Sequence, residues 1–88
     1  MKKFRTSIHT EQQRWLRQRF VAQRKALGLS QRALSERLGV IYSLIGKIET
    51  GDRHLDILEF IDYCHALELD PTALLHELQH APNLAPPE

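Results

Sequence analysis

The 88-residue chain has little of several features that would place it in other classes of protein. Its single cysteine, Cys64, rules out a disulfide within the chain and suits a reducing compartment. No run of about 18 apolar residues is present, so no transmembrane helix is predicted. The N-terminal sequence MKKFRTSIHT has no apolar segment behind its lysines and does not resemble a secretory signal. We therefore expect a cytoplasmic protein without membrane contact.

Lysine and arginine are absent from the C-terminal part of the chain. All 12 lie in residues 1–53 with four acidic residues, a net charge of +8, whereas residues 54–88 carry seven acidic residues, a net charge of −7. A basic half attracts phosphate groups, because binding releases the counterions condensed on a nucleic acid. The acidic half would then have to point away from DNA. The alternative is a chance segregation of charges along a polar chain.

The sequence also lacks strand patterns, and its apolar residues recur at helical spacing. Helix starts are predicted at the N-caps Ser30, Asp56 and Asp70, and two short helices are expected to end at Gly39 and Gly51. The fold class predicted is all-α with five helices, over 11–27, 30–38 and 42–50 and from Asp56 and Asp70 onward. We expect one domain over 10–80, with a flexible basic arm at 1–9 and a disordered tail at 81–88.

One apolar side of each predicted helix is expected to form the core. The inward residues predicted are Trp15, Leu16, Phe20, Leu27, Ala33, Leu34, Leu38, Leu44, Ile45, Ile48, Ile57, Phe60, Ile61, Cys64 and Leu67, with Ala22 or Ala26 beside the first of them and Val40 packed into a turn. Leu74, Leu75 and Leu78 exceed what a short terminal helix needs for its own packing. These three leucines are therefore predicted to form the surface of a homodimer.

Residues 30–51, SQRALSERLGVIYSLIGKIETG, contain two short helical patterns hinged at Gly39. This is the outline of a helix-turn-helix, whose second helix lies in the major groove of DNA. The chain resembles Cro/lambda-repressor-type (XRE-like) proteins over residues 16–78. The resemblance is carried by Arg24, Leu29-Ser30-Gln31, Leu34, Gly39-Val40, Ile45, Ile48-Glu49 and Gly51, and it continues through Asp56 and Ala66-Leu67. It implies a five-helix, lambda-repressor-like domain that binds double-stranded DNA.

The resemblance also implies specific site residues. Base contacts would come from Ile41, Tyr42, Ser43 and Lys47, phosphate contacts from Gln31, Thr50 and Arg53, and a salt bridge from Arg24 and Glu49. By their charge alone, Arg32, Arg14, Arg17 and Arg37 are further candidates for phosphate contacts.

The second helix of the motif departs from the family pattern. Ile41 occupies the position that usually holds a capping serine or threonine, and a lost cap costs about 1 kcal/mol. Gly46 lies in the helix interior, at a cost of about 1 kcal/mol relative to alanine. It either permits close approach of DNA or of the preceding helix, or is a tolerated surface glycine. Glutamine and asparagine, the usual adenine-binding residues, are absent between 41 and 51.

Two functions fit these features. The first is a sequence-specific transcriptional regulator of bacterial or phage type, a repressor that binds a two-fold operator as a homodimer. The alternative is an antitoxin-like or phage-type module that binds a protein partner such as a toxin, with or without DNA. No cofactor or metal is expected, because His76 and His80 lack further ligands for zinc. Cys64 and His65 are adjacent in a helix and point apart, so we do not expect an enzyme.

Overall fold

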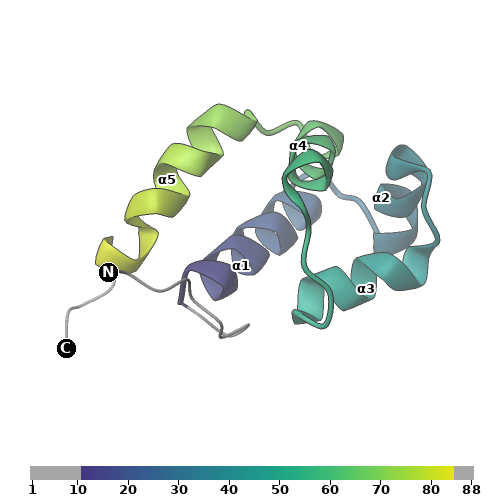
Figure 1. Cartoon of the computed structure of the whole chain (residues 1–88). Coiled ribbons are helices and arrows are strands. Elements are labelled where there is room, and N and C mark those ends of the chain that lie inside the picture. Colours follow the sequence, from purple (N-terminus) through teal and green to yellow (C-terminus); the bar gives the residue numbers. More distant parts are fainter. Residues whose placement is uncertain (1–10, 85–88) are drawn as a thin grey trace.

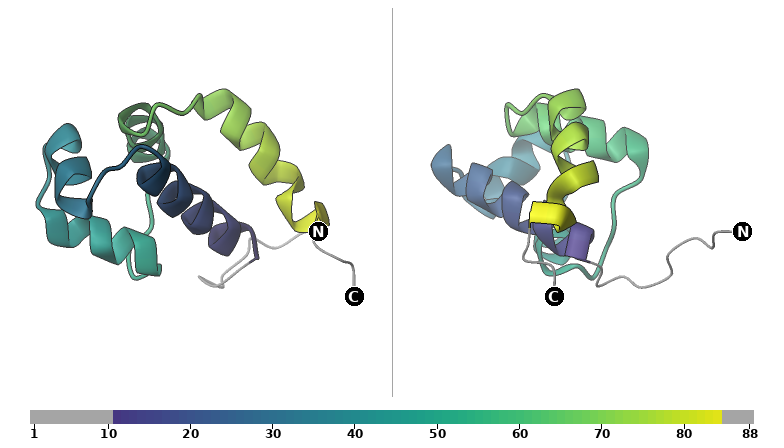
Figure 2. Two further views of the ribbon diagram at one scale, coloured as in Figure 1. Left: turned by 180° about the vertical axis from the view of Figure 1, so that it is seen from behind. Right: turned by 90° about the vertical axis from the view of Figure 1, so that its left-hand side faces the viewer.

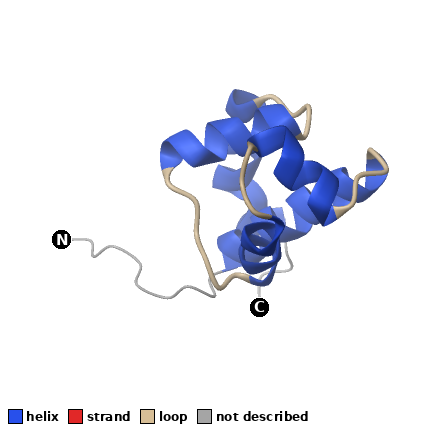
Figure 3. Cartoon of the chain, turned by 90° about the vertical axis from the view of Figure 1, so that its right-hand side faces the viewer, coloured by secondary structure: helices blue, strands red, loops and turns tan. Residues whose placement is uncertain are grey.

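The computed structural model describes the backbone of residues 11–84 and the side chains of residues 11–81. It has five helices, α1 (Glu11–Ala26), α2 (Gln31–Leu38), α3 (Tyr42–Thr50), α4 (Ile57–Ala66) and α5 (Pro71–Leu84), shown in Figure 1. No strand occurs within residues 11–84 (Figure 3). The predicted five-helix, all-α fold is confirmed. None of these helices is both long and apolar enough to cross a membrane.

The helices are arranged so that the α2–α3 pair and α5 lie at opposite ends of the molecule (Figures 1 and 2). Helix α1 packs against α3 and α5, while α4 packs against α2 and α5. Seen from the front and from behind, the α2–α3 pair lies at one end and α5 at the other, with α1 and α4 between them (Figures 1 and 2). The basic and acidic segments meet at these helix contacts, where Arg19 pairs with Glu77 and Arg37 pairs with Glu68.

The helix boundaries follow from local capping interactions, as the sequence predicts. The Ser30 hydroxyl accepts a hydrogen bond from the Ala33 amide at 3.0 Å. Asp56 and Glu59 form a reciprocal capping box at the start of α4, with bonds of 2.8 and 3.0 Å. Gly39 ends α2 in the left-handed conformation, with φ 71°. These caps fix where each short helix starts or stops, and hence which side it turns inward.

The core is centred on three rings and the apolar sides of α2, α3 and α4. Phe20 of α1 packs against Phe60 and Tyr63 of α4, with ring centroids 6.1 and 4.7 Å apart. The other buried members are Leu34, Ile45, Ile48, Cys64, Leu67 and Leu74. Burial raises the pKa of the Cys64 thiol to about 11, so the thiolate needed for a nucleophile is disfavoured.

Some predicted core positions are wrong. Of the alternatives Trp15, Ala22 and Ala26, only Trp15 packs against the core. Ile57 is 60% exposed: it has the helical spacing of the buried Phe60 and Cys64, but it is the first residue of α4, where little of the domain covers it. The inward stripe is Phe60, Tyr63, Cys64 and Leu67, and Tyr63 was not among the residues predicted. Val40, expected to pack into the turn, is 37% exposed.

The C-terminal helix is longer than the sequence predicts. Helix α5 continues to Leu84, whereas a disordered tail was expected from Ala81. Ala81 is only 3% exposed, so its packing holds the last turn against the domain. The predicted arm at 1–9 lies outside the described residues, as do residues 85–88.

Candidate nucleic-acid interface

Helix α3 presents its predicted base-contacting residues on one exposed side. Ile45 and Ile48 are buried, and this places Ser43, Lys47 and Thr50, which recur at spacings of four and three, on the outer side of the helix. Ile41 and Tyr42, at the start of the helix, are 73% and 48% exposed. As predicted, Ile41 makes no side-chain capping bond.

A buried ion pair fixes α3 to α1. Arg24 Nε donates to Glu49 Oε2 at 2.6 Å and Nη2 donates to Oε1 at 3.1 Å, with the two side chains only 11% and 9% exposed. Arg24 Nη1 also donates to the Leu29 carbonyl oxygen at 2.8 Å. Gln31 Nε2 donates to Glu49 Oε1 at 2.9 Å, which ties the start of α2 to the same carboxylate. The expected salt bridge is present, and Gln31 keeps a second amide hydrogen to donate to a phosphate.

Arg32 lies over the ring of Tyr42. Its guanidinium carbon is 4.3 Å from the ring centroid, within the range of a cation–π interaction. Both side chains belong to exposed residues, one at the start of α2 and one at the start of α3. The contact brings a predicted phosphate-binding residue and a predicted base-contacting residue together on the surface.

Two of the candidate phosphate-binding arginines are instead directed toward α4. Arg53 donates two hydrogen bonds to Glu59, at 2.8 and 3.2 Å, and these bonds lower the pKa of the Glu59 carboxyl group. Arg37 donates to the carbonyl oxygen of Ala66 at 2.8 Å and to Glu68 at 3.1 Å. The bonds to Glu59 use part of the Arg53 guanidinium and partly offset its charge.

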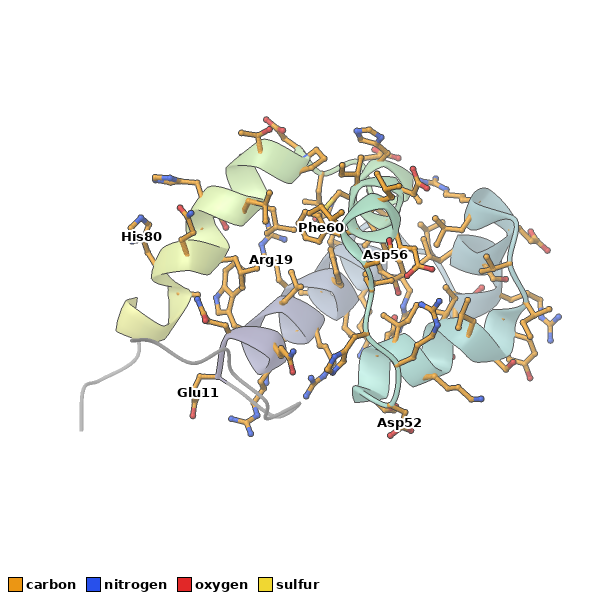
Figure 4. All side chains as sticks on the ribbon, in the orientation of Figure 1. Glu11, Arg19, Asp52, Asp56, Phe60 and His80 are labelled. Carbon is orange, nitrogen blue, oxygen red and sulfur yellow. The ribbon has the colours of Figure 1, made fainter. Side chains whose placement is uncertain are left out.

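The pairing of charges separates the cations of residues 11–81 into two groups. Five arginines have an acidic partner within 4.0 Å: Arg14, Arg19, Arg24, Arg37 and Arg53. Arg19, for example, bridges from α1 toward Glu77 of α5, and its position between the two helices is visible in Figure 4. The cations among the described residues without an acidic partner are Arg17, Lys25, Arg32 and Lys47.

A groove between α1 and the end of α3 adds two of these unpaired cations to the site. It has a volume of about 590 Å³ and is lined by Arg14, Arg17, Gln18, Val21, Ala22, Lys25, Glu49 and Thr50. Arg17 lies over Gly51, where an added Cβ would come within 2.8 Å of its Cζ. Its Nη1 is buried without a hydrogen-bond partner. Lys25 was missed as a candidate, although its spacing from Arg14, Gln18 and Ala22 indicates one side of a helix.

The histidines of α5 form no larger cluster. The rings of His76 and His80 are 5.0 Å apart, with His80 on the outer side of the helix in Figure 4. No group of three or more potential metal ligands from histidine, cysteine, aspartate and glutamate occurs within the described part of the chain.

An exposed second helix on a tightly packed α2–α3 pair, bordered by unpaired cations, defines a helix-turn-helix protein of the DNA-binding class. The chain matches the family model described as helix-turn-helix over residues 22–74. It is 35% identical to a solved XRE-family like protein from Pseudomonas syringae pv. tomato str. DC3000, with a TM-score of 0.77, covering 90% of this chain and 93% of that chain. A search of curated proteins gave no significant match. The chain belongs to the XRE-type helix-turn-helix family of DNA-binding regulators.

Proposed function

We propose that this protein is a transcriptional repressor that binds a two-fold operator as a homodimer and blocks transcription by occupying the site. The observation that carries the proposal is the position of the unpaired cations Arg17, Lys25, Arg32 and Lys47 around α3 and the start of α2. Cations without an acidic partner are free to neutralise phosphates on both sides of a helix inserted in the major groove. The two half-sites would lie about one helical turn apart, ~34 Å.

The contacts follow from the exposed side chains. Base edges would meet Ile41, Tyr42, Ser43 and Lys47, of which Lys47 suits the O6 and N7 acceptors of guanine. Phosphates would meet Gln31, Arg32 and Thr50 on the two flanks of α3, and Arg17 and Lys25 in the groove beside α1. Arg53 would join them with the guanidinium N–H groups that its bonds to Glu59 leave available.

The proposed homodimer needs an apolar surface outside the α2–α3 pair. Of the predicted leucine surface, Leu74 is 2% exposed and therefore used inside the monomer. Leu78 is partly buried and Leu75 is 37% exposed. Ile57 and Leu58, at the start of α4, are 60% and 70% exposed. We propose that these two residues contribute more to self-association than Leu75 does, because they offer more apolar surface for burial.

The test of the DNA-binding function is selection of bound sequences from a random pool, followed by fluorescence-anisotropy titration at several salt concentrations. We expect a palindromic site that is bound roughly 10³-fold or more tightly than random DNA. The logarithm of the affinity should fall linearly with the logarithm of salt concentration, with a slope of about −0.9 per phosphate contact. Equal affinity for selected and random DNA would reject sequence-specific repression.

A protein partner is the second candidate, and a groove on another surface favours it. The groove lies between the α2–α3 turn and α4, has a volume of about 450 Å³, and includes Leu38, Val40, Leu44 and Leu55 among its lining residues. An antitoxin-like protein would bind its toxin there while the α1–α3 surface stays free. Co-purification with the product of a neighbouring gene tests this. The His65→Glu variant, changed at an exposed groove residue on α4, should then lose the partner but keep its DNA affinity.

A further inference from the structure

Three consecutive apolar side chains are exposed where the turn enters α3. Val40, Ile41 and Tyr42 are 37%, 73% and 48% exposed. Val40 lies in the turn, Ile41 is the N-cap, and Tyr42 is the first residue of α3, the helix that carries the predicted base contacts. Ile41 lies at the N-cap position with extended backbone, φ −72° and ψ 145°, and makes no side-chain capping bond. In the free protein this isoleucine therefore gives up a cap and buries little apolar surface, so its contribution to folding is unfavourable.

The surroundings of this apolar tip favour DNA over a protein as the group that covers it. Arg32 lies over the Tyr42 ring, and Lys47 is exposed one turn further along α3. Neither cation has an acidic partner within the described residues. An apolar surface bordered by unpaired cations matches a groove whose floor presents base edges and whose walls present phosphates.

The floor of the major groove has one exposed apolar group, the C5-methyl of thymine. We propose that Ile41, with the ring of Tyr42 beside it, binds thymine methyl groups, so that each half-site carries thymine opposite the start of α3. Specificity would then come from burial of methyl groups at this point of the site, in place of the amide hydrogen bonds that glutamine or asparagine would make. The proposal rests on the DNA-binding function proposed above and adds the class of base that is recognised.

The test replaces thymine by uracil, which removes the methyl group and leaves every base-pairing hydrogen bond in place. A selected site is first obtained with the native protein, and each thymine is then replaced in turn by uracil. Loss of one buried methyl contact should weaken binding about fourfold at the thymines that meet Ile41 or Tyr42. Uracil at the other thymines of the site serves as the internal control.

The Ile41→Ser variant separates recognition from folding. Serine can cap α3, so this variant should fold and have a thermal midpoint about 5 °C higher than the native protein. It should also bind the thymine and uracil sites equally at the position that Ile41 meets. The matched Lys47→Gln variant should bind both sites more weakly and keep the native ratio between them.

The outcomes distinguish this inference from the function on which it rests. A native protein that selects no site contradicts the proposed function and this inference with it. A selected site whose affinity is unchanged by uracil at every thymine leaves the function intact and overturns the methyl contact. An Ile41→Ser variant that keeps the native ratio, or that unfolds at a lower temperature, shows that Ile41 is structural. If this variant binds DNA as the native protein does but no longer co-purifies with a partner protein, the tip is a protein-binding surface and the methyl contact is overturned.

Discussion

The surface around α3 and the region of α4 and α5 differ in whether their basic side chains have acidic partners. Cations directed toward α4 and α5 are paired with acids, as Arg37 is with Glu68 and Arg53 with Glu59. Around α3, by contrast, Lys47 and Arg32 have no acidic partner within the described residues. Charge counted along the sequence identifies the basic half, but only the pairing in the fold shows which of its side chains are free to bind phosphate.

A second difference between the two regions is the depth of their ion pairs. The Arg24–Glu49 pair joins α1 to α3 and is about one-tenth exposed, whereas the side chains of the Arg53–Glu59 pair are 36% and 39% exposed. Water screens an exposed pair, while a buried charge that loses its partner stays desolvated. The position of α3 against α1 therefore depends on the Arg24–Glu49 pair. The start of α4 depends much less on the Arg53–Glu59 pair.

The largest expected effect is the loss of the buried pair. The Glu49→Ala variant should lose about 3–5 kcal/mol of unfolding free energy, because it leaves the Arg24 guanidinium buried without its carboxylate. Urea denaturation followed by circular dichroism measures this loss. The control is Arg53→Gln, which breaks the exposed pair and should leave stability nearly unchanged. Similar losses in both variants would contradict the proposed contrast in burial.

The next effect concerns self-association through the start of α4. The Leu58→Glu variant should favour the monomer by several kcal/mol, because a two-fold contact would bring the two introduced carboxylates close together. Sedimentation equilibrium of the native protein and the variant measures the shift. Leu75→Glu is the matched control on α5 and should have the smaller effect, because Leu75 is less exposed than Leu58. A larger effect of Leu75→Glu than of Leu58→Glu would indicate that the dimer forms through α5.

A smaller effect is expected from removing one unpaired cation. The Lys47→Ala variant should lose about 1–3 kcal/mol of affinity for the selected site if the lysine contacts a base edge. Arg37→Ala removes the same charge from an arginine that is paired with Glu68, and it should leave DNA affinity almost unchanged. Anisotropy titrations at two salt concentrations measure both variants. Equal losses would show that total charge, and not pairing, determines the affinity.

Most of the fold was predictable because its signals are local. Ser30, Gly39 and the Asp56–Glu59 capping box act within one helical turn, so their sequence spacing is enough to place the helix ends. The exposure of Ile57 was not predicted, because its spacing from Phe60 and Cys64 is that of an inward residue. Whether the rest of the domain covers the first turn of α4 depends on tertiary packing, which local spacing does not show.

The candidate site was less predictable because its charges depend on contacts between helices. Arg53 was expected at a phosphate from its place after α3, yet Glu59, six residues away, holds it by two hydrogen bonds. The phosphate contacts proposed for Arg17 and Lys25 rest on the groove that α1 forms with the end of α3. No local pattern around these residues indicates which carboxylate, if any, will lie beside them.

The smallest predicted effect is a change in stability when Gly46, inside α3, is replaced. Gly46 has room for a methyl group, because an added Cβ would meet only Gln31 Oε1, at an ordinary contact distance of 3.7 Å. Close approach of α2 therefore does not require the glycine. The Gly46→Ala variant should gain about 1 kcal/mol of unfolding free energy, measured by urea denaturation, because alanine loses less backbone entropy in a helix.

DNA affinity of the same variant decides between the two remaining explanations for Gly46. The added Cβ would face Gln31, away from the outer stripe that carries Lys47, so we expect the selected site to be bound as tightly as before. Gly46 is then a tolerated glycine whose replacement affects stability alone. A variant that is more stable but binds DNA more weakly would instead show that the DNA backbone approaches α3 at this residue, and it would extend the binding surface from the outer stripe toward α2.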